Sequence, residues 1–144
     1  MLDSVLRAQP RAEVVFHLGD MCVDIADLRY EYPAKMFYII RGNCDFYADF
    51  PDNVTVTLEG KRVFAAHGHL FGVKRGLGEL YRQARAERAD ICLFGHTHVP
   101  HESYKDGMYL FNPGSLGAPR DGRPSTCGVI DIGGHGIVTT VVEL

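Results

Sequence analysis

The chain has 144 residues, of which 46% are hydrophobic and 23% are charged, and its formal net charge at pH 7 is -3. This length predicts one domain, residues 1–144, that is large enough to bury a core. The charge balance gives no reason to expect a nucleic-acid partner. No stretch approaches the roughly 18 apolar residues of a membrane span, and the first residues lack the layout of a signal peptide. We therefore expect a cytoplasmic protein that needs neither nucleic acid nor a membrane.

Helical patterns and short apolar runs alternate over the first two thirds of the chain. The helical patterns lie at 2–9, 23–32 and 76–90. The apolar runs, which we expect to be strands, lie at 13–18, 35–40 and 91–94, and a strand, a glycine turn and a second strand are predicted over 53–67. This alternation is typical of a layered α/β fold.

The last third of the chain has the pattern of two β-hairpins. The first, over 101–112, turns at Asp106-Gly107, and the second, over 126–144, turns around Gly133-Gly134. The four cysteines are scattered without a CxxC pair, so they predict free thiols and neither a zinc knuckle nor a disulfide framework.

Five of the predicted strands end in a glycine beside a polar residue of the metal-ligating or turn type. These blocks are Gly19-Asp20, Gly42-Asn43, His67-Gly68-His69, Gly95-His96-Thr97-His98 and Asn112-Pro113-Gly114-Ser115. In α/β sheets, ligand sites form beyond the carboxyl ends of the strands, and glycine there lets the backbone turn sharply. The pattern predicts a site at one edge of the sheet.

The residue types at these strand ends indicate a divalent-metal site. Carboxylate, amide oxygen and imidazole together suit Mn, Fe, Zn, Ni or Co without a cysteine. Two such ions about 3.5–4 Å apart can clamp an attacking oxygen and a phosphoryl oxygen. His96 and His98 flank Thr97, so in an extended segment both would point to the same side and each could serve one ion. A surface turn that gathers histidines by chance is the alternative.

The motifs GD, GNCD, HGH, GHTH and NPGS, in this order, resemble the calcineurin-like metallophosphoesterase superfamily. The branch most similar is that of the small bacterial and archaeal phosphodiesterases, which have GNCD where larger relatives have GNHD. The resemblance covers essentially the whole chain. It implies a four-layer α/β fold, a β-sandwich flanked by helices, and hydrolysis of a small phosphate ester, in particular a phosphodiester. It also implies one or two divalent ions per chain, Mn, Ni, Zn or Fe.

The same resemblance assigns roles to individual residues. Asp20 would bridge both metals; Asn43, His67 and His96 would complete the shell of the second metal, and His98 would belong to the first. Asp20, Asn43 and His67 are the residues we expect at the catalytic centre, where a metal-bound hydroxide would attack the phosphorus.

Further positions are expected to support the reaction. Asp45 would fix the loop geometry, and His69 and Arg120 are expected to face the substrate. Cys44 stands where many relatives keep a histidine that assists the leaving group. A thiol is a poor substitute at neutral pH, because its unperturbed pKa is about 8.5.

One motif of the family is missing from these residues. The family begins with a strand that ends in Asp-x-His and supplies two ligands to the first metal, whereas no Asp-x-His occurs in this sequence and its opening, MLDSVLR, has the pattern of the helix that follows that strand. We therefore expect a fold that lacks the family's first strand and a first metal site that retains only Asp20 and His98.

The missing ligands leave an alternative function open. A catalytically impaired or silent phosphoesterase-fold module that binds or scaffolds, as the retromer scaffold subunit does, would have the same motifs. Loss of a strand from the sheet would also expose edges and apolar surface, which favours a homo-oligomer.

Overall fold

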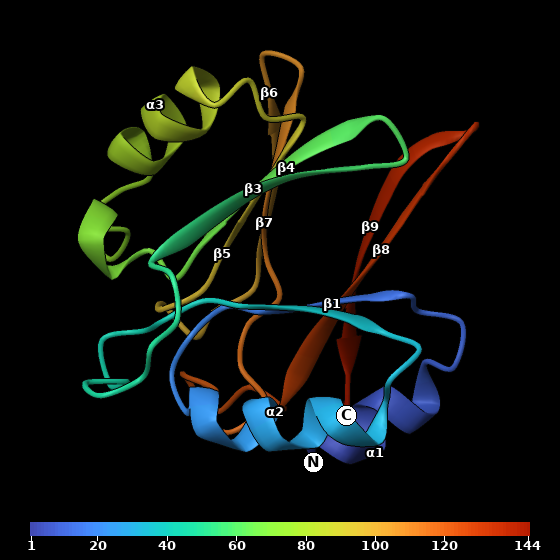
Figure 1. Cartoon of the computed structure of the whole chain (residues 1–144). Helices are drawn as coiled ribbons and strands as arrows, with labels where there is room; N and C mark the ends of the chain where they lie inside the picture. The colour runs from blue at the N-terminus through green and yellow to red at the C-terminus, as the bar shows by residue number, and fades with distance from the viewer.

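Two layers of β-strands lie between helices in the computed structural model, which describes residues 1–144 (Figure 1). The helices are α1 (Leu2–Ala8), α2 (Cys22–Leu28) and α3 (Gly78–Ala86), with 3-10 turns at Arg29–Glu31 and His69–Phe71. The strands are β1 (Val14–His17), β2 (Met36–Ile39), β3 (Asn53–Leu58), β4 (Lys61–Ala66), β5 (Ile91–Phe94), β6 (His101–Lys105), β7 (Met108–Asn112), β8 (Thr126–Gly133) and β9 (Gly136–Glu143). The expected four-layer arrangement is confirmed.

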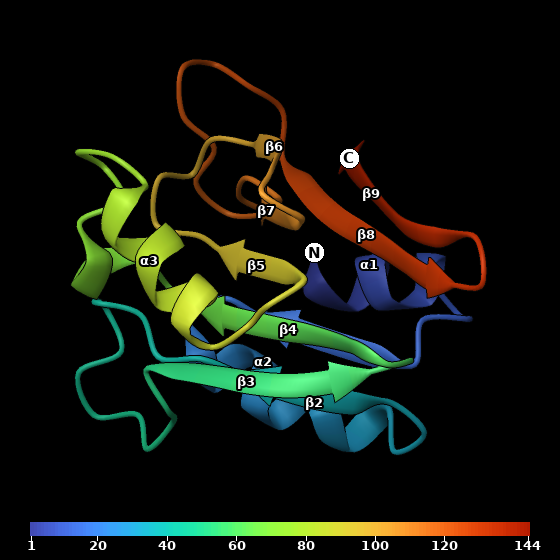
Figure 2. The same ribbon diagram turned by 90° about the horizontal axis from the view of Figure 1, so that it is seen from above.

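The larger sheet has the strand order β3-β4-β5-β7-β6, in which β4, β5 and β7 are parallel and β3 and β6 are antiparallel at the edges. Its central strands are buried on both faces, because α3 packs on one face and the second layer of strands packs on the other. Phe64 and Ala66 of β4 pack against the layer of α3, whereas Val63 and Ala65 pack against the opposite layer. Figure 2 shows α3 on one side of this sheet and the β8–β9 hairpin on the other.

The second layer consists of two separate pairs of strands. β1 and β2 are parallel, with Val14 opposite Met36 and His17 opposite Ile39, and β8 and β9 form an antiparallel hairpin. Helices α1 and α2 cover the outer side of this layer, where Cys22, Ile25 and Ile39 form a small buried cluster. β1 pairs with β2 alone and β8 with β9 alone, so the expected unpaired strand edges are present.

The boundaries of two helices differ from the prediction. The helical pattern at 23–32 is α-helical only to Leu28 and continues as the 3-10 turn Arg29–Glu31, and the one at 76–90 begins at Gly78 and ends at Ala86. Both predicted hairpins are confirmed. Asp106 and Gly107 have positive φ values of 49° and 83°, as a tight hairpin turn requires, while the second turn falls on Gly134 and His135.

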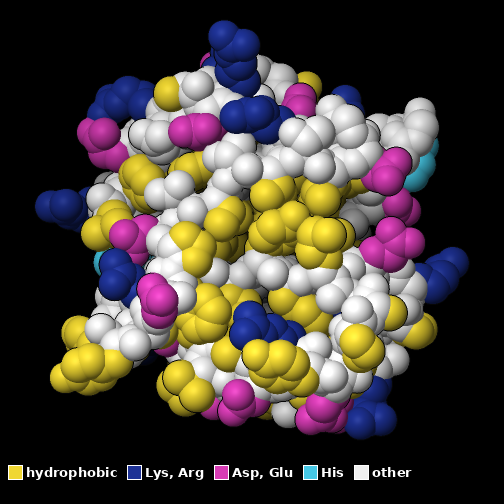
Figure 3. Space-filling model, viewed as in Figure 1, with side chains coloured by type: hydrophobic (Ala, Val, Ile, Leu, Met, Phe, Trp, Pro, Cys, Tyr) yellow, Lys and Arg dark blue, Asp and Glu magenta, His cyan; other side chains and the backbone are white.

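Apolar side chains also reach the surface. They gather across the middle of the face that Figure 3 shows, between the five-stranded sheet and helices α1 and α2. A shallow groove beside β2 is lined by Phe37, Ile39, Phe50, Pro51 and Val54. No helix of the chain is long and apolar enough to cross a membrane.

The packing of α3 depends on Leu80, whose side chain is fully buried against the sheet. Replacing it by alanine, Leu80→Ala, is expected to lower the free energy of unfolding by about 2–5 kcal/mol, because transfer energy is lost and a cavity remains. Urea unfolding followed by circular dichroism measures the change. Leu144→Ala is the matched control: this leucine is 54% exposed, and the expected change is below about 0.5 kcal/mol. Equal losses in the two variants would contradict the packing described.

Candidate metal site

Four of the predicted ligand residues converge where β1, β2, β4 and β5 end. The centre of the cluster is the Nε2 atom of His67, whose side chain is only 2% exposed. This atom lies 3.1 Å from Oδ1 of Asn43, 3.0 Å from Nδ1 of His96 and 3.6 Å from Oδ2 of Asp20. Residues from four separate segments thus place one carboxylate, one amide and a second imidazole around the Nε2 atom of His67.

Two glycines allow the loops to approach this closely. A Cβ atom on Gly19 would lie 2.5 Å from Nδ1 of His67, and one on Gly42 would lie 2.2 Å from Oδ1 of Asp20. Gly19 also has a φ of +101°, which residues with a side chain rarely adopt. The GD and GN pairs of the sequence therefore have a steric reason: Gly19 makes room for the ring of His67, and Gly42 makes room for the carboxylate of Asp20.

Asp45 ties the Asp20 loop to the Asn43 loop. Its carboxylate is buried and accepts hydrogen bonds from the backbone N–H groups of Asp20 (2.7 Å), Cys22 (2.9 Å) and Gly42 (2.8 Å), and from the thiol of Cys22 (3.0 Å). Burial raises the pKa of this carboxyl, but the hydrogen bonds from Cys22, Gly42 and Asp20 outweigh it and bring the pKa below its usual value. Asp45 is therefore ionised at neutral pH, and it fixes the loop geometry as expected.

A backbone carbonyl decides which nitrogen of His67 can bind a metal. Nδ1 lies 2.6 Å from the carbonyl oxygen of Leu18, which can only accept a hydrogen bond, so Nδ1 carries the proton. The lone pair is then on Nε2, the atom that faces Asp20, Asn43 and His96. Histidines that ligate metals usually donate their other ring N–H to a carbonyl or carboxylate in this way.

The extended geometry expected for His96-Thr97-His98 is wrong. His96 and His98 have positive φ values of 64° and 58°, and the N–H of Thr97 bonds back to the carbonyl of Gly95 at 2.8 Å. The segment is a tight turn, because the chain reverses here before β6. Only His96 joins the cluster around His67. His98 donates from Nδ1 to the carbonyl of Ala118 at 2.7 Å, which leaves its Nε2 free to accept.

The first residue of the NPGS block, Asn112, forms hydrogen bonds to the turn that carries His96 and His98. Asn112 is fully buried; its Nδ2 donates to the carbonyl of Gly95 (3.1 Å) and to the hydroxyl of Thr97 (2.9 Å), and its Oδ1 accepts from the N–H of Gly114. All of its polar atoms are used within the protein. Asn112 therefore holds the turn that carries His96 and His98.

The two predicted substrate-facing residues lie in different situations. The ring of His69 lies 5.2 Å from that of His67 and 6.1 Å from that of His96, and its buried Nδ1 has no hydrogen-bond partner. Arg120 is exposed, two residues beyond the Ala118 that holds His98, and its guanidinium forms no ion pair.

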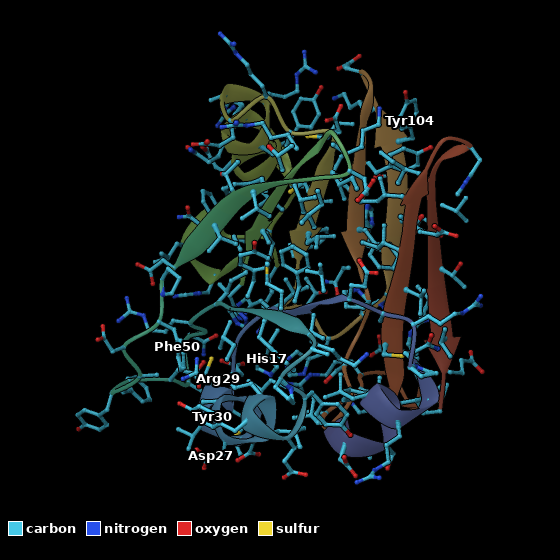
Figure 4. The ribbon with its side chains drawn as sticks, turned by 45° about the vertical axis from the view of Figure 1, so that its right-hand side comes forward. His17, Asp27, Arg29, Tyr30, Phe50 and Tyr104 are labelled. Atoms are coloured by element: carbon cyan, nitrogen blue, oxygen red, sulfur yellow. The ribbon has the colours of Figure 1, made fainter.

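His17, by contrast, belongs to the interior of the fold. It is the last residue of β1 and lies beside α2, with its Nδ1 3.9 Å from the sulfur of Cys22 (Figure 4). Burial lowers the pKa of His17. It is the packed strand residue that its apolar neighbours in the sequence indicate. All four cysteines are free thiols, as predicted.

The electrostatics of the cluster keep its imidazoles neutral. Burial, and next the charge of Lys74, lower the pKa of His96 to about 4, and burial lowers that of His67. The carboxylate of Asp20 raises the pKa of the Cys44 thiol, so Cys44 is protonated at neutral pH. Neutral imidazoles are the form that ligates metals.

The donor set fits a divalent ion by chemistry. Two imidazoles, one carboxylate and one amide oxygen form the mixed nitrogen and oxygen set that borderline divalent ions prefer. No three histidine, cysteine or carboxylate side chains are arranged around a common point as a coordination shell, and the side chains of Asn43, His67 and His96 contact one another directly. An ion bound here would replace these mutual contacts.

The family of the chain follows from comparison with known proteins. Residues 2–135 match the profile of the calcineurin-like phosphoesterase superfamily domain. The chain belongs to this superfamily. It is 31% identical over 127 residues to the probable metallophosphoesterase YsnB of Bacillus subtilis. This matched region covers 88% of the chain and 72% of YsnB. It is 35% identical over 100 residues to phosphodiesterase YfcE of Escherichia coli K12. Here the matched region covers 64% of the chain and 50% of YfcE.

Solved structures agree with this assignment. A predicted phosphoesterase of Streptococcus pneumoniae superposes with a TM-score of 0.82 at 30% identity, over 99% of this chain and 80% of that chain. Vps29 of Entamoeba histolytica superposes with a TM-score of 0.78 over 99% of this chain and 89% of that chain, but at 18% identity this likeness concerns the fold alone.

As a calcineurin-like phosphoesterase the chain is a hydrolase of phosphate esters, and its cofactors are divalent metal ions. The alternative of a silent scaffold module receives no support from its relatives, which are named for phosphoesterase activity.

Two features of this phosphoesterase carried no signal in the sequence. The carbonyls of Leu18 and Ala118, which orient His67 and His98, are backbone atoms that any residue could provide. Lys74 lies outside every motif, yet its positive charge lowers the pKa of His96 and acts against the rise in that of Cys44. Only the folded chain brings these groups to the site.

Adding a methyl group at Gly42 tests the close approach between this glycine and the carboxylate of Asp20. Gly42→Ala is expected to displace the Asp20 carboxylate and therefore to weaken Mn²⁺ binding and to lower the free energy of unfolding by about 1–3 kcal/mol. Calorimetric titration with Mn²⁺ and thermal unfolding measure both effects. Gly78→Ala is the control, because nothing lies within 4 Å of its added Cβ atom. Unchanged Mn²⁺ affinity in Gly42→Ala would show that Asp20 does not depend on this contact.

The low pKa of His96 predicts how the stability of the metal-free protein varies with pH. An unfolded histidine has a pKa near 6.5 and the folded His96 one of about 4, so between these values the unfolded state binds more protons. The stabilisation is complete above pH 6.5 and is lost as the pH falls toward 4. We expect the Tm to fall across this window, and to fall less steeply in His96→Gln. Parallel Tm curves for the two proteins would contradict the shift.

Proposed function

We propose that this chain hydrolyses phosphodiesters of small molecules, with a divalent metal held by Asp20, Asn43, His67 and His96. The observation that carries the proposal is the convergence of three donor atoms on Nε2 of His67, within 3.0 to 3.6 Å. The relative named phosphodiesterase, YfcE of E. coli, supports a diester as the substrate class.

A second ion would share Asp20 with the first. His98 is its candidate ligand, because the bond from its Nδ1 to Ala118 leaves Nε2 as the free acceptor. Asp20 and His98 alone are a small donor set, so we propose that the second ion binds more weakly than the first. Mn²⁺ and Ni²⁺ suit the mixed set of nitrogen and oxygen donors and are our first choices.

Divalent ions supply Lewis-acid activation of water and neutralise charge on the phosphate oxygens when they are bound. The protein's own contribution is to hold its donors in place. Asp45 fixes the loops of Asp20 and Asn43, and the carbonyl of Leu18 holds His67 in the tautomer whose lone pair faces the site. No side chain is needed as a nucleophile, and the protonated Cys44 thiol is not a reactive group.

His69 is proposed to meet the substrate. Its unpaired, buried Nδ1 is a polar atom that a ligand's oxygen or hydroxyl can satisfy, and unsatisfied buried nitrogen is costly. Arg120 is proposed as a second contact on the loop that also holds His98.

Turnover of bis(4-nitrophenyl) phosphate tests the function. Protein loaded with Mn²⁺ and desalted should hydrolyse it, and Asp20→Asn and His67→Asn should each lose about a hundredfold or more, since even outer-shell changes at metal sites cost 10–100-fold. His135→Asn is the control, because His135 lies exposed in the β8–β9 turn. Absence of turnover with Mn²⁺, Ni²⁺, Co²⁺ and Zn²⁺ would overturn the proposal.

Metal content measured by mass spectrometry on the same samples tests the ligand assignments. Loss of His67 should remove the tightly bound ion. His98→Asn should leave that ion in place and reduce only the content above one ion per chain. If His98→Asn also removed the tightly bound ion, the division of ligands between two ions would be wrong.

A further inference from the structure

Strand β2 has a partner strand on one side only. The N–H groups of Met36 and Ile40 bond to carbonyl oxygens of the neighbouring β1 segment at 2.8 and 3.0 Å. Because the backbone groups of successive residues point to opposite edges of a strand, those of Phe37 and Ile39 point away from β1. β2 pairs with no other strand, so this second edge is open.

One end of the open edge already binds a backbone group of the protein. Arg41 is the next residue whose N–H points to this edge, and it bonds to the carbonyl of Pro51 at 2.8 Å. The loop before β3 therefore covers the end of the edge, whereas the N–H and C=O groups of Phe37 and Ile39 have no backbone partner. An extended peptide has the complementary row of donors and acceptors and can pair with them.

The amino acids of β2 do not protect this edge against pairing. Edge strands usually carry a charge, a proline or a bulge that prevents another strand from adding. β6, an edge of the larger sheet, follows this rule with Glu102 and Lys105, whereas the four residues of β2 are Met, Phe, Tyr and Ile. An open edge without charge is therefore suited to receive a strand.

The groove described above lies beside this edge and has a volume of about 190 Å³. Its walls come from β2, from Phe50 and Pro51 of the loop before β3, and from Val54 of β3. It belongs to the face on which Figure 3 shows apolar side chains gathered. Because side chains of a strand alternate, every second side chain of a peptide paired with β2 would enter the groove.

The groove also has one cationic residue, Arg29. Its side chain is partly buried and forms no ion pair with a carboxylate. Nη2 donates to the hydroxyl of Tyr30 at 3.0 Å, and the guanidinium lies 5.0 Å from the centre of the Tyr30 ring. Figure 4 shows Arg29 between Phe50 and Tyr30. The guanidinium is thus held at the groove with donors to spare, and a carboxylate is the group that matches them.

We propose that this groove binds an extended segment of a partner polypeptide. The segment adds to the open edge of β2, places apolar side chains in the groove and brings a carboxylate to Arg29. A second copy of the chain paired through the same edge would not supply that carboxylate, because β2 has no charged residue. No residue of the groove is a proposed metal ligand, and the inference does not rest on the proposed function.

The probe is a phage library of random peptides, selected on the immobilised wild-type protein. Selection should enrich sequences that combine alternating apolar residues with an aspartate or a glutamate. In calorimetric titrations of a selected peptide, Arg29→Gln should raise the Kd by roughly fivefold to tenfold, as expected for one charge-assisted contact. Changing the acidic residue of the peptide to its amide should have the same effect on the wild-type protein and no further effect on Arg29→Gln. Arg75→Gln is the matched control, because Arg75 is exposed, forms no ion pair and lies outside the groove.

Backbone pairing is tested on the peptide, which leaves the protein unchanged. N-methylation of alternate residues removes the N–H donors that face β2 and should raise the Kd by roughly tenfold or more. Methylation of the other alternate set is the control, because those N–H groups point away from β2 and should leave the Kd nearly unchanged.

Three results would overturn the inference. The first is a selection that enriches no peptide. The second is a selected peptide that binds equally well to Arg29→Gln and in both N-methylated forms. Light scattering of the wild-type protein gives the third: a dimer that the selected peptide dissociates would show that a second copy occupies the groove.

Discussion

The hydrogen bond between Nδ1 of His67 and the carbonyl of Leu18 is the contact on which the site depends most. His67 follows β4 of the five-stranded sheet and Leu18 follows β1 of the other layer, so this bond joins the two layers at the edge where their parallel strands end. It also decides that Nε2 faces the other donors. One contact thus connects the packing of the sheets with the chemistry of the cluster.

Around this contact the chain uses buried polar groups as supports. Asp45 accepts hydrogen bonds from three backbone N–H groups of two loops. Asn112 donates to the carbonyl of Gly95 and the hydroxyl of Thr97, and so holds the turn that carries His96. Such fully bonded polar groups rigidify a site, whereas a half-bonded one would be costly. The proposed donors are therefore held by residues outside the donor set, and such support is a general requirement for a precise site.

The charges of the cluster suit a cation. Asp20 supplies a carboxylate, and burial keeps the imidazoles of His67 and His96 neutral, which is the form that ligates metals. A bound divalent ion would neutralise charge on the oxygens of a phosphate ester. Membership of the calcineurin-like phosphoesterase superfamily agrees with this chemistry.

The sequence by itself determined the order of the elements, both hairpins and the edge of the sheet at which the ligand residues gather, because hydrophobic period and glycine position are local signals. It also indicated Asp20, Asn43, His67 and His96 as a group. Only the tertiary structure decided that His96 and His98 lie in a tight turn and that Asn112 holds this turn through its side-chain hydrogen bonds. These depend on bonds to backbone carbonyls and on a chain reversal between distant residues, and neither leaves a periodic pattern in the amino-acid letters.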